Sequence, residues 1–203
     1  MREVLYEECA RNAQDTQRAK ICKTMFGLSV VFAVLFVILL YLFLQLAASV
    51  LSGAVEDDNP SAWNAFFFLF IALLVACFAA AVLLFVFRNR PNPSFDYTFV
   101  SGELRVAKVF NSLSRKLMCV VNCEEILKVG KVGSHTYERL KGMRDTKESV
   151  LTPNKEPAEG KGFYYLYLNG ALGKTLYVLE CREEMIANVL QFAKRGVLEE
   201  DYR

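Results

Sequence analysis

The stretch "LLFVFRNRPNPSFDYTFVSGELRVAKVF", residues 83–110, changes its character in the middle. Before Arg88 nearly every side chain is apolar, and after Pro93 apolar and polar side chains largely alternate. A long apolar run is typical of a helix in a bilayer, whereas alternation with a period of two is typical of a β-strand with one buried face. The sequence therefore predicts that the chain leaves a membrane near residues 88–94 and enters a water-soluble, β-rich domain.

Two uncharged runs precede this point, residues 26–51 and 62–87, and each is 26 residues long. As a helix, each run would measure about 39 Å, which exceeds the hydrocarbon core of about 30 Å. Backbone groups must be paired in lipid, so both runs are expected to be helical. The connecting loop 52–61 is acidic and contains glycine and proline, which is typical of a turn. We expect a transmembrane helical hairpin over residues 26–87.

Basic residues beside the two runs predict the orientation of this hairpin. They are Arg2, Arg11, Arg18, Lys20, Lys23, Arg88 and Arg90. The loop between the runs holds no Lys or Arg, so the positive-inside rule places both termini and the β-rich domain in the cytoplasm. A cleaved signal peptide is the alternative for the first run, but that run is longer than the apolar core of a signal. We expect a two-pass protein of the cell membrane.

The apolar runs are expected to act as an anchor in the lipid bilayer, because the polar intramembrane residues that a pore or transporter uses are almost absent. Ala72, Ala76 and Ala80 are spaced four apart and so lie on one face of the second helix. Small side chains at this spacing permit close helix packing, either within the hairpin or between copies in a homo-oligomer. The alternative is that alanine is simply common in membrane helices.

Residues 1–25 mix basic and acidic side chains with a thin set of apolar ones. Residue types that favour helices dominate this segment. We therefore expect a solvated cytoplasmic helix there, which extends the first span into the cytoplasm, and the alternative is a helix that lies on the membrane surface.

The soluble domain is expected to span residues 94–196. Alternating apolar residues predict four short strands between residues 95 and 132, with a tight turn at Ser101-Gly102, as in an antiparallel meander. Residues 133–161 carry charges of both signs, prolines and few large apolar groups, so a long mobile loop is expected.

Regular structure is expected to return after this loop. The stretches "GFYYLYLNG" and "KTLYVLEC" predict an aromatic-rich hairpin. An amphipathic helix follows, with Gly196 as its natural stop, and residues 197–203 are expected to be a tail. The expected fold class is a membrane α-hairpin plus an α+β domain, in which an antiparallel sheet or partial barrel is covered by a C-terminal amphipathic helix.

Two segments, "FDYTFVSGELRVAKVFNSLSRKLMCVVNCEEI" and "FYYLYLNGALGKTLYVLEC", carry a resemblance to a known family. Together with two preceding spans they resemble an uncharacterised family of small membrane proteins of Gram-positive bacteria with a pleckstrin-homology-like (PH-like) domain. The resemblance covers roughly residues 90–195. It implies a PH-like fold, and it implies no activity.

The resemblance to pleckstrin-homology domains also raises the question of lipid headgroups, which many such domains bind around their first strand-to-strand turn. Here the turn at Ser101-Gly102 is tight and uncharged. The basic residues Lys108, Arg115 and Lys116 instead flank the next turn, where they are candidates to meet anionic headgroups. The alternative is that they form a solvated edge.

Six cysteines raise the possibility of metal or redox chemistry. Cys119 and Cys123 are spaced like a metal-binding pair, and His135 and Cys181 are conceivable further ligands. Zinc sites usually present two paired clusters, however, and free cysteine is among the most buried residue types. A cysteine-dependent metal-binding or redox protein is therefore the alternative, and core packing is the expectation.

No sequence pattern points to a catalytic site. Glu124 and Glu125 are neighbours on an expected strand, so they would point to opposite faces. No phosphate-binding glycine-rich loop of the right length occurs, and the net charge of +2 gives no argument for nucleic acid. We expect a non-catalytic interaction or scaffold module without a cofactor, in which Tyr164 and Tyr165 are candidate exposed contacts to a protein or peptide partner.

Overall fold

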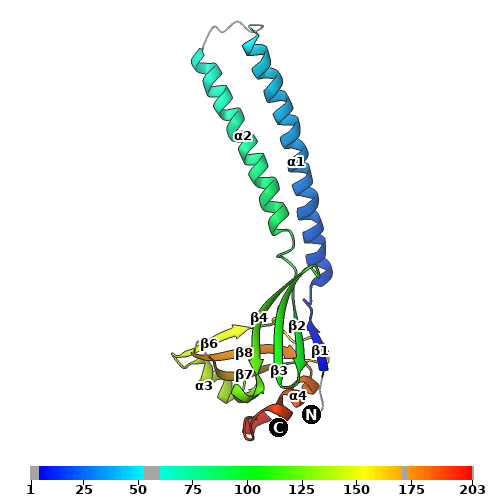
Figure 1. The fold of residues 1–203 in the computed structure, drawn as a ribbon, viewed down its shortest axis with the longest axis vertical. Helices are drawn as coiled ribbons and strands as arrows, with labels where there is room; N and C mark the ends of the chain where they lie inside the picture. The colour runs from blue at the N-terminus through cyan, green and yellow to red at the C-terminus, as the bar shows by residue number, and fades with distance from the viewer. Residues whose placement is uncertain (1–4, 53–59, 171–172, 203) are drawn as a thin grey trace. The chain divides into compact units, whose positions relative to one another are not determined.

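The computed structural model describes residues 5–52, 60–170 and 173–202 (Figure 1). The chain divides into two compact units. One is the helical segment 16–91, and the other is a domain formed by residues 1–15 together with residues 92–203. The domain is thus built from two parts of the chain that the helical segment separates.

The helical unit contains α1, Asp15–Leu51, and α2, Pro60–Phe87. Both helices are long and apolar enough to cross a membrane, as the two uncharged runs predicted. They pack side by side through aromatic pairs, including Phe36 with Phe78 at 5.4 Å and Phe26 with Phe85 at 6.5 Å between ring centroids. The expected acidic loop lies mostly outside the described residues.

The alanine face of α2 does not serve the contact between these two helices. Within residues 63–87 of α2, whose burial is described, Leu74 and Cys77 are buried, whereas Ala72 and Ala76 are exposed and Ala80 is half-buried. Packing within the hairpin therefore leaves the alanine face accessible.

The prediction of a helix over residues 1–25 is wrong for residues 5–14 and is confirmed from Asp15 onward, while residues 1–4 lie outside the described part of the chain. Leu5–Ala10 forms strand β1, and α1 begins only at Asp15. β1 pairs antiparallel with β2, Pro93–Val100, from Leu5 opposite Val100 to Ala10 opposite Phe95. Long-range pairing with β2 overrides the local helix propensity of this segment.

The first sheet has the strand order β1-β2-β3-β4, where β3 is Glu103–Phe110 and β4 is Ser114–Asn122. The predicted tight turn joins β2 to β3, with positive φ at both Ser101 and Gly102. Three strands of the predicted meander are therefore confirmed.

The fourth predicted strand lies in a second sheet, so the four-strand meander is wrong at that step. This sheet has the order β5-β7-β8-β6. Its strands are β5 Ile126–Lys131, β6 Thr146–Val150, β7 Gly162–Gly170 and β8 Gly173–Cys181. β7 and β8 form the predicted aromatic hairpin, and β6 pairs parallel with β8. The sheets are mainly antiparallel and do not close into a barrel.

The prediction of a long loop over residues 133–161 is also wrong. Helix α3, His135–Lys141, begins after Ser134, whose Oγ accepts a hydrogen bond from the Tyr137 backbone N–H at 3.1 Å. β6 follows within the same stretch. Tyr137 and Leu140 are buried against β7 and β8, so a few apolar groups suffice to hold α3 on the second sheet.

The main core lies between the two sheets and helix α4, Glu183–Phe192. The predicted C-terminal helix is confirmed, although it ends before Ala193. Short 3-10 turns occupy Cys123–Glu125 and Glu200–Tyr202.

The expected tail is part of the domain rather than an appendage. The Val129 N–H donates to Val197, and the Glu199 N–H donates back to Val129, both at 2.9 Å. Gly130 is required beside this contact, because a Cβ there would collide with the Glu199 carboxylate.

Candidate functional site

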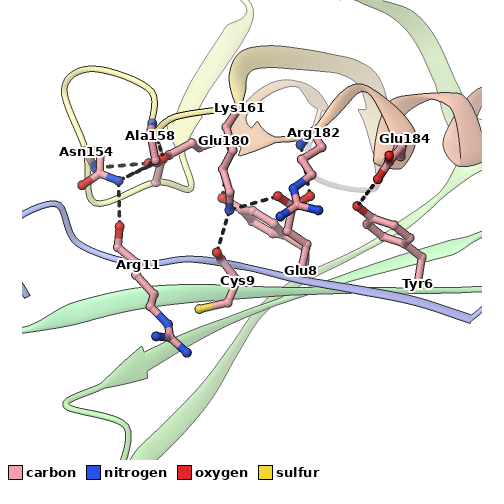
Figure 2. Close-up of polar contacts among 12 residues, drawn as sticks. Tyr6, Glu8, Cys9, Arg11, Asn154, Ala158, Lys161, Glu180, Arg182 and Glu184 are labelled. Atoms are coloured by element: carbon pink, nitrogen blue, oxygen red, sulfur yellow. Dashed lines mark hydrogen bonds and ion pairs between the residues drawn. The ribbon is translucent and has the colours of Figure 1, made fainter.

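Side-chain contacts hold β1 in place from the far part of the chain (Figure 2). Nζ of Lys161 lies 2.9 Å from Oε1 of Glu8 and donates to the backbone carbonyl of Cys9 at 2.7 Å. The Glu8 carboxylate also accepts the Arg182 backbone N–H at 3.1 Å. Because the Lys161 and Glu8 side chains are only 13% and 7% exposed, this ion pair is largely shielded from water.

A second polar cluster centres on Glu180 of β8, which is fully buried (Figure 2). Its carboxylate accepts hydrogen bonds from Asn154 Nδ2 at 2.8 Å, from the Ala158 N–H at 3.0 Å and from the Thr152 hydroxyl. The same Asn154 amide donates to the carbonyl of Arg11 at 2.8 Å. Glu180 therefore fixes the loop between β6 and β7 and, through Asn154, the chain just after β1.

The strand register shows at which end of the first sheet the chain leaves the domain and re-enters it. Ala10 at the end of β1 lies opposite Phe95 near the start of β2, so the chain leaves the domain and re-enters it at the same end of the first sheet. The turn between β3 and β4 lies at this end as well, because Pro93 is opposite Phe110. The Asn111 N–H donates to the Asn92 carbonyl at 2.8 Å.

The three basic residues predicted as headgroup contacts all flank this turn, but only Lys108 and Lys116 share one face of the sheet, whereas Arg115 lies on the other face. Lys108 and Lys116 are direct register partners across β3 and β4. Like charges directly opposite each other destabilise an antiparallel pair. Among the described residues neither lysine forms an ion pair with an acid, and Lys108 instead lies over the ring of Phe95 at 5.5 Å from Nζ to the centroid. Arg115 differs, since it pairs with Asp96 at 3.4 Å.

The tip of the same turn is strained and apolar. Asn111 and Ser112 both have positive φ, of 49° and 57°, which is uncommon for residues other than glycine. Leu113 follows and is 72% exposed. A leucine projecting between basic residues is the combination found on surfaces that meet a membrane interface.

The outer face of the first sheet carries a polar groove of about 490 Å³ beside this turn. Its lining includes Glu7, Asp96 and Thr98 together with Arg11 and Arg115. Charges of both signs line it, so it offers no field of one sign that would select an ionic ligand.

Strand β4 forms an open edge of the first sheet with exposed apolar side chains. Leu117 is 59% exposed, Met118 45% and Val120 50%. The register shifts between Val106 and Ala107, which leaves Met118 as a bulge. Edge strands with exposed apolar residues are templates for pairing with another chain.

The four residues predicted for metal binding do not all come together, because the three cysteines lie in or against the main core and His135 does not. Cys123 and Cys181 are fully buried in the main core, Cys119 is half-buried on β4, and His135 is exposed at the start of α3. Burial raises the pKa of the Cys119 thiol to about 11 and that of Cys123 to about 12, and it also raises the pKa of Cys181. Metal ligation needs the thiolate, which these surroundings disfavour. Within the part of the chain that the structure describes, no three His, Cys, Asp or Glu side chains are grouped to hold a metal ion.

The prediction of Tyr164 and Tyr165 as exposed contacts is wrong. They are 3% and 0% exposed. β7 is covered on both faces, with Tyr164 in the main core and Tyr165 in the second core under α3. The Tyr165 hydroxyl donates to Glu199 at 3.1 Å, and burial raises the pKa values of both tyrosines.

Sequence reasoning missed Glu8, Lys161 and Glu180, which hold the domain together. Glu8 and Lys161 lie in charged segments that are typical of solvent-exposed chain, and Glu180 is the single acid of the mainly apolar strand β8. Only the contact between two distant parts of the sequence gives these residues partners.

A mainly antiparallel domain with a C-terminal helix, preceded by two candidate membrane-spanning helices, defines a membrane-associated protein with a PH-like domain. The sequence model of the family described as "Bacterial PH-like domain (DUF6106)" matches residues 61–199. The chain belongs to this family. Comparison with curated proteins and with solved structures gave no match. The family match begins after α1, so β1 lies outside it although it completes the first sheet.

Proposed function

We propose that this protein is a membrane-anchored, non-catalytic interaction module. Its helical hairpin holds the PH-like domain at the cytoplasmic face of the cell membrane, and the domain binds an extended segment of a partner protein along β4. The observation that carries this proposal is the open β4 edge, on which Leu117, Met118 and Val120 are exposed. Addition of a strand to such an edge is a common mode of peptide recognition.

The other sheet edges support the choice of β4. β5 is covered by residues 197–199, whose backbone is hydrogen-bonded to Val129. β1 is held by the contacts of Lys161 and Asn154 to its carbonyl groups and to those just after it. β6 carries the charged pair Lys147 and Glu148, and charged side chains protect a strand edge from pairing.

The test uses a photo-crosslinking residue at Val120 of the full-length protein in its native membrane. The matched control places the same residue at Val150, a valine of β6 that is 55% exposed where Val120 is 50% exposed. The proposal predicts a discrete crosslinked species from position 120 that is absent from position 150 and is lost in a Leu117→Lys background. Equal crosslinking from both positions, or none from position 120, contradicts it.

The two-pass orientation is supported by the pairing of β1 with β2. β1 precedes both helices and β2 follows them, so residues 5–10 and 93–100 lie on one side of any membrane that the helices cross. The basic residues favour the cytoplasmic side. Maleimide labelling of intact cells tests this, with single cysteines at Asp57 and at Glu159. Labelling at position 57 alone is expected, and labelling at position 159 alone contradicts cytoplasmic placement.

A further inference from the structure

We propose that the turn between β3 and β4 docks onto the anionic surface of the same membrane that anchors the protein, with Lys108 and Lys116 binding lipid phosphate groups and Leu113 inserting between them. This inference rests on the membrane anchoring proposed above. It assigns a second contact to the domain, separate from the β4 edge.

The first argument is the unusual arrangement of charge. Lys108 and Lys116 face each other across the ladder, and among the described residues no acid is paired with either of them. Two ammonium groups held at adjacent positions repel each other unless an anion lies between or above them. The neighbouring Arg115 has its own acid, Asp96, at 3.4 Å, so the unneutralised charge resides on the two lysines.

The second argument is distance along the chain. The Asn111 N–H is bonded to the Asn92 carbonyl, and Asn92 lies five residues beyond the last residue of α2, Phe87. Five residues reach at most about 18 Å. If α2 spans the bilayer, its end lies at the headgroups, and the turn is therefore tethered within reach of them.

The third argument is the apolar tip. Leu113 is 72% exposed at the apex of a turn whose two preceding residues have strained, positive φ values. Phe110 and Phe95 lie under the Lys108 ammonium group, at 5.3 and 5.5 Å from Nζ to the ring centroids. These rings orient the ammonium group at the end of the sheet. Basic residues around an exposed leucine match an interface of phosphate groups above acyl chains.

The experiment takes advantage of the single tryptophan of the chain, Trp63. The full-length protein carrying Trp63→Phe and Leu113→Trp is reconstituted in nanodiscs of phosphatidylcholine, with or without phosphatidylglycerol, and brominated lipids serve as contact quenchers of fluorescence. The inference predicts blue-shifted, strongly quenched emission in anionic discs. Each lysine near an anionic surface strengthens binding to that surface. The double variant Lys108→Gln, Lys116→Gln should therefore lower the ratio of docked to undocked protein about 30-fold.

Two controls isolate the effect. Lys147→Gln with Lys174→Gln removes the same charge from the second sheet and should leave the quenching unchanged. A tryptophan at Glu103, at the opposite end of β3, should not be quenched in either disc.

Each other outcome overturns the inference. Equal quenching in anionic and zwitterionic discs shows that the lysines do not select the surface. No quenching at position 113 shows that the turn stays in water. Free inorganic phosphate cannot produce bromine quenching, so a shift caused by phosphate alone in zwitterionic discs identifies a soluble anion as the occupant and also contradicts docking. Failure of the protein to enter nanodiscs would instead count against the membrane anchor itself.

Discussion

Nζ of Lys161 lies 2.9 Å from Oε1 of Glu8, and this nearly buried ion pair joins the chain before the two helices to the chain after them. The helical segment is therefore an insertion between two adjacent strands of one domain. Residues that lie far apart in the sequence must meet before the domain is complete.

Replacing Lys161 by methionine should destabilise the domain strongly. The substitution leaves the Glu8 carboxylate buried without its cation, which typically costs about 3–5 kcal/mol. The combined change Glu8→Leu with Lys161→Met should recover most of that loss, because no charge then remains buried. Urea unfolding of the purified protein measures both, with Lys155→Met, an exposed residue of the same loop, as the control. A loss below about 1 kcal/mol, the range of exposed pairs, would show that the ion pair is solvated.

Replacing Glu180 by glutamine should release the loop between β6 and β7. Every partner of this carboxylate is a donor, so an amide N–H₂ would face a donor and leave it unsatisfied, at about 1–3 kcal/mol. We expect faster protease cleavage between residues 152 and 161. Glu156→Gln, an exposed change in the same loop, should cleave at the wild-type rate. Equal cleavage of the two variants would contradict the clamping role of Glu180.

A protein in which a short Gly-Ser linker replaces residues 16–91 should fold as a stable domain. The side chain of Asn92 donates to the Asp15 carboxylate, so the two ends to be joined are already neighbours. Residues 92–203 alone lack β1 and leave an unpaired β2 edge and an unpaired Lys161, so they should aggregate or unfold at lower temperature. Thermal unfolding compares the two, and equal stability would show that β1 is dispensable.

Alkaline pH should destabilise the domain through its buried thiols. Burial raises the pKa of Cys123 from 9.0 to about 12. The raised pKa means that folding favours the neutral thiol. The stability that the neutral Cys123 thiol contributes is complete below pH 9 and is lost between pH 9 and about 12. Over that range the free energy of unfolding falls by up to about 1.4 kcal/mol per pH unit.

The measurement for this prediction is the free energy of unfolding between about pH 7 and 10.5, a range that begins below the ordinary thiol pKa and extends well above it. In the Cys123→Val variant the free energy of unfolding should decline less steeply above pH 9, because one titrating thiol has been removed. This difference in slope is expected whatever the effect of the substitution on stability at neutral pH. An unchanged slope in the variant would show that Cys123 does not titrate in this range.

The sequence predicted the elements whose signal is local. Two long uncharged runs, the turn at Ser101-Gly102 and the aromatic hairpin each follow from a pattern within a few neighbouring residues. β1 escaped prediction because its six residues include two glutamates and because its partner strand lies after both helices. Its stability comes from β2, Lys161 and Arg182, which local propensity cannot register.

The candidate site residues also differ in whether their surroundings follow from nearby sequence or from distant segments of the chain. Lys108 and Lys116 are brought together because the hairpin register follows from the second turn, and the same register places Arg115 on the other face. The sequence predicts Tyr164 and Tyr165 as surface contacts because α3, which covers Tyr165, forms from a segment whose charged residues predict a loop. A strand covered on both faces has no polar face, so the surplus of aromatic residues in β7 reflects two cores.

The pairing of β1 with β2 in the intact membrane protein is the central claim, and a disulfide tests it most directly. Cys9 is a register partner of Asp96, so Asp96→Cys places two thiols opposite each other at a separation suited to a disulfide. Mild oxidation of membranes should give, in high yield by mass spectrometry, a disulfide-linked peptide that joins positions 9 and 96. Thr98→Cys, which is diagonal to Cys9, should give little. A linkage from position 98 but not from position 96, or from neither, would contradict the pairing and with it the placement of both ends of the helical hairpin on one side of the membrane.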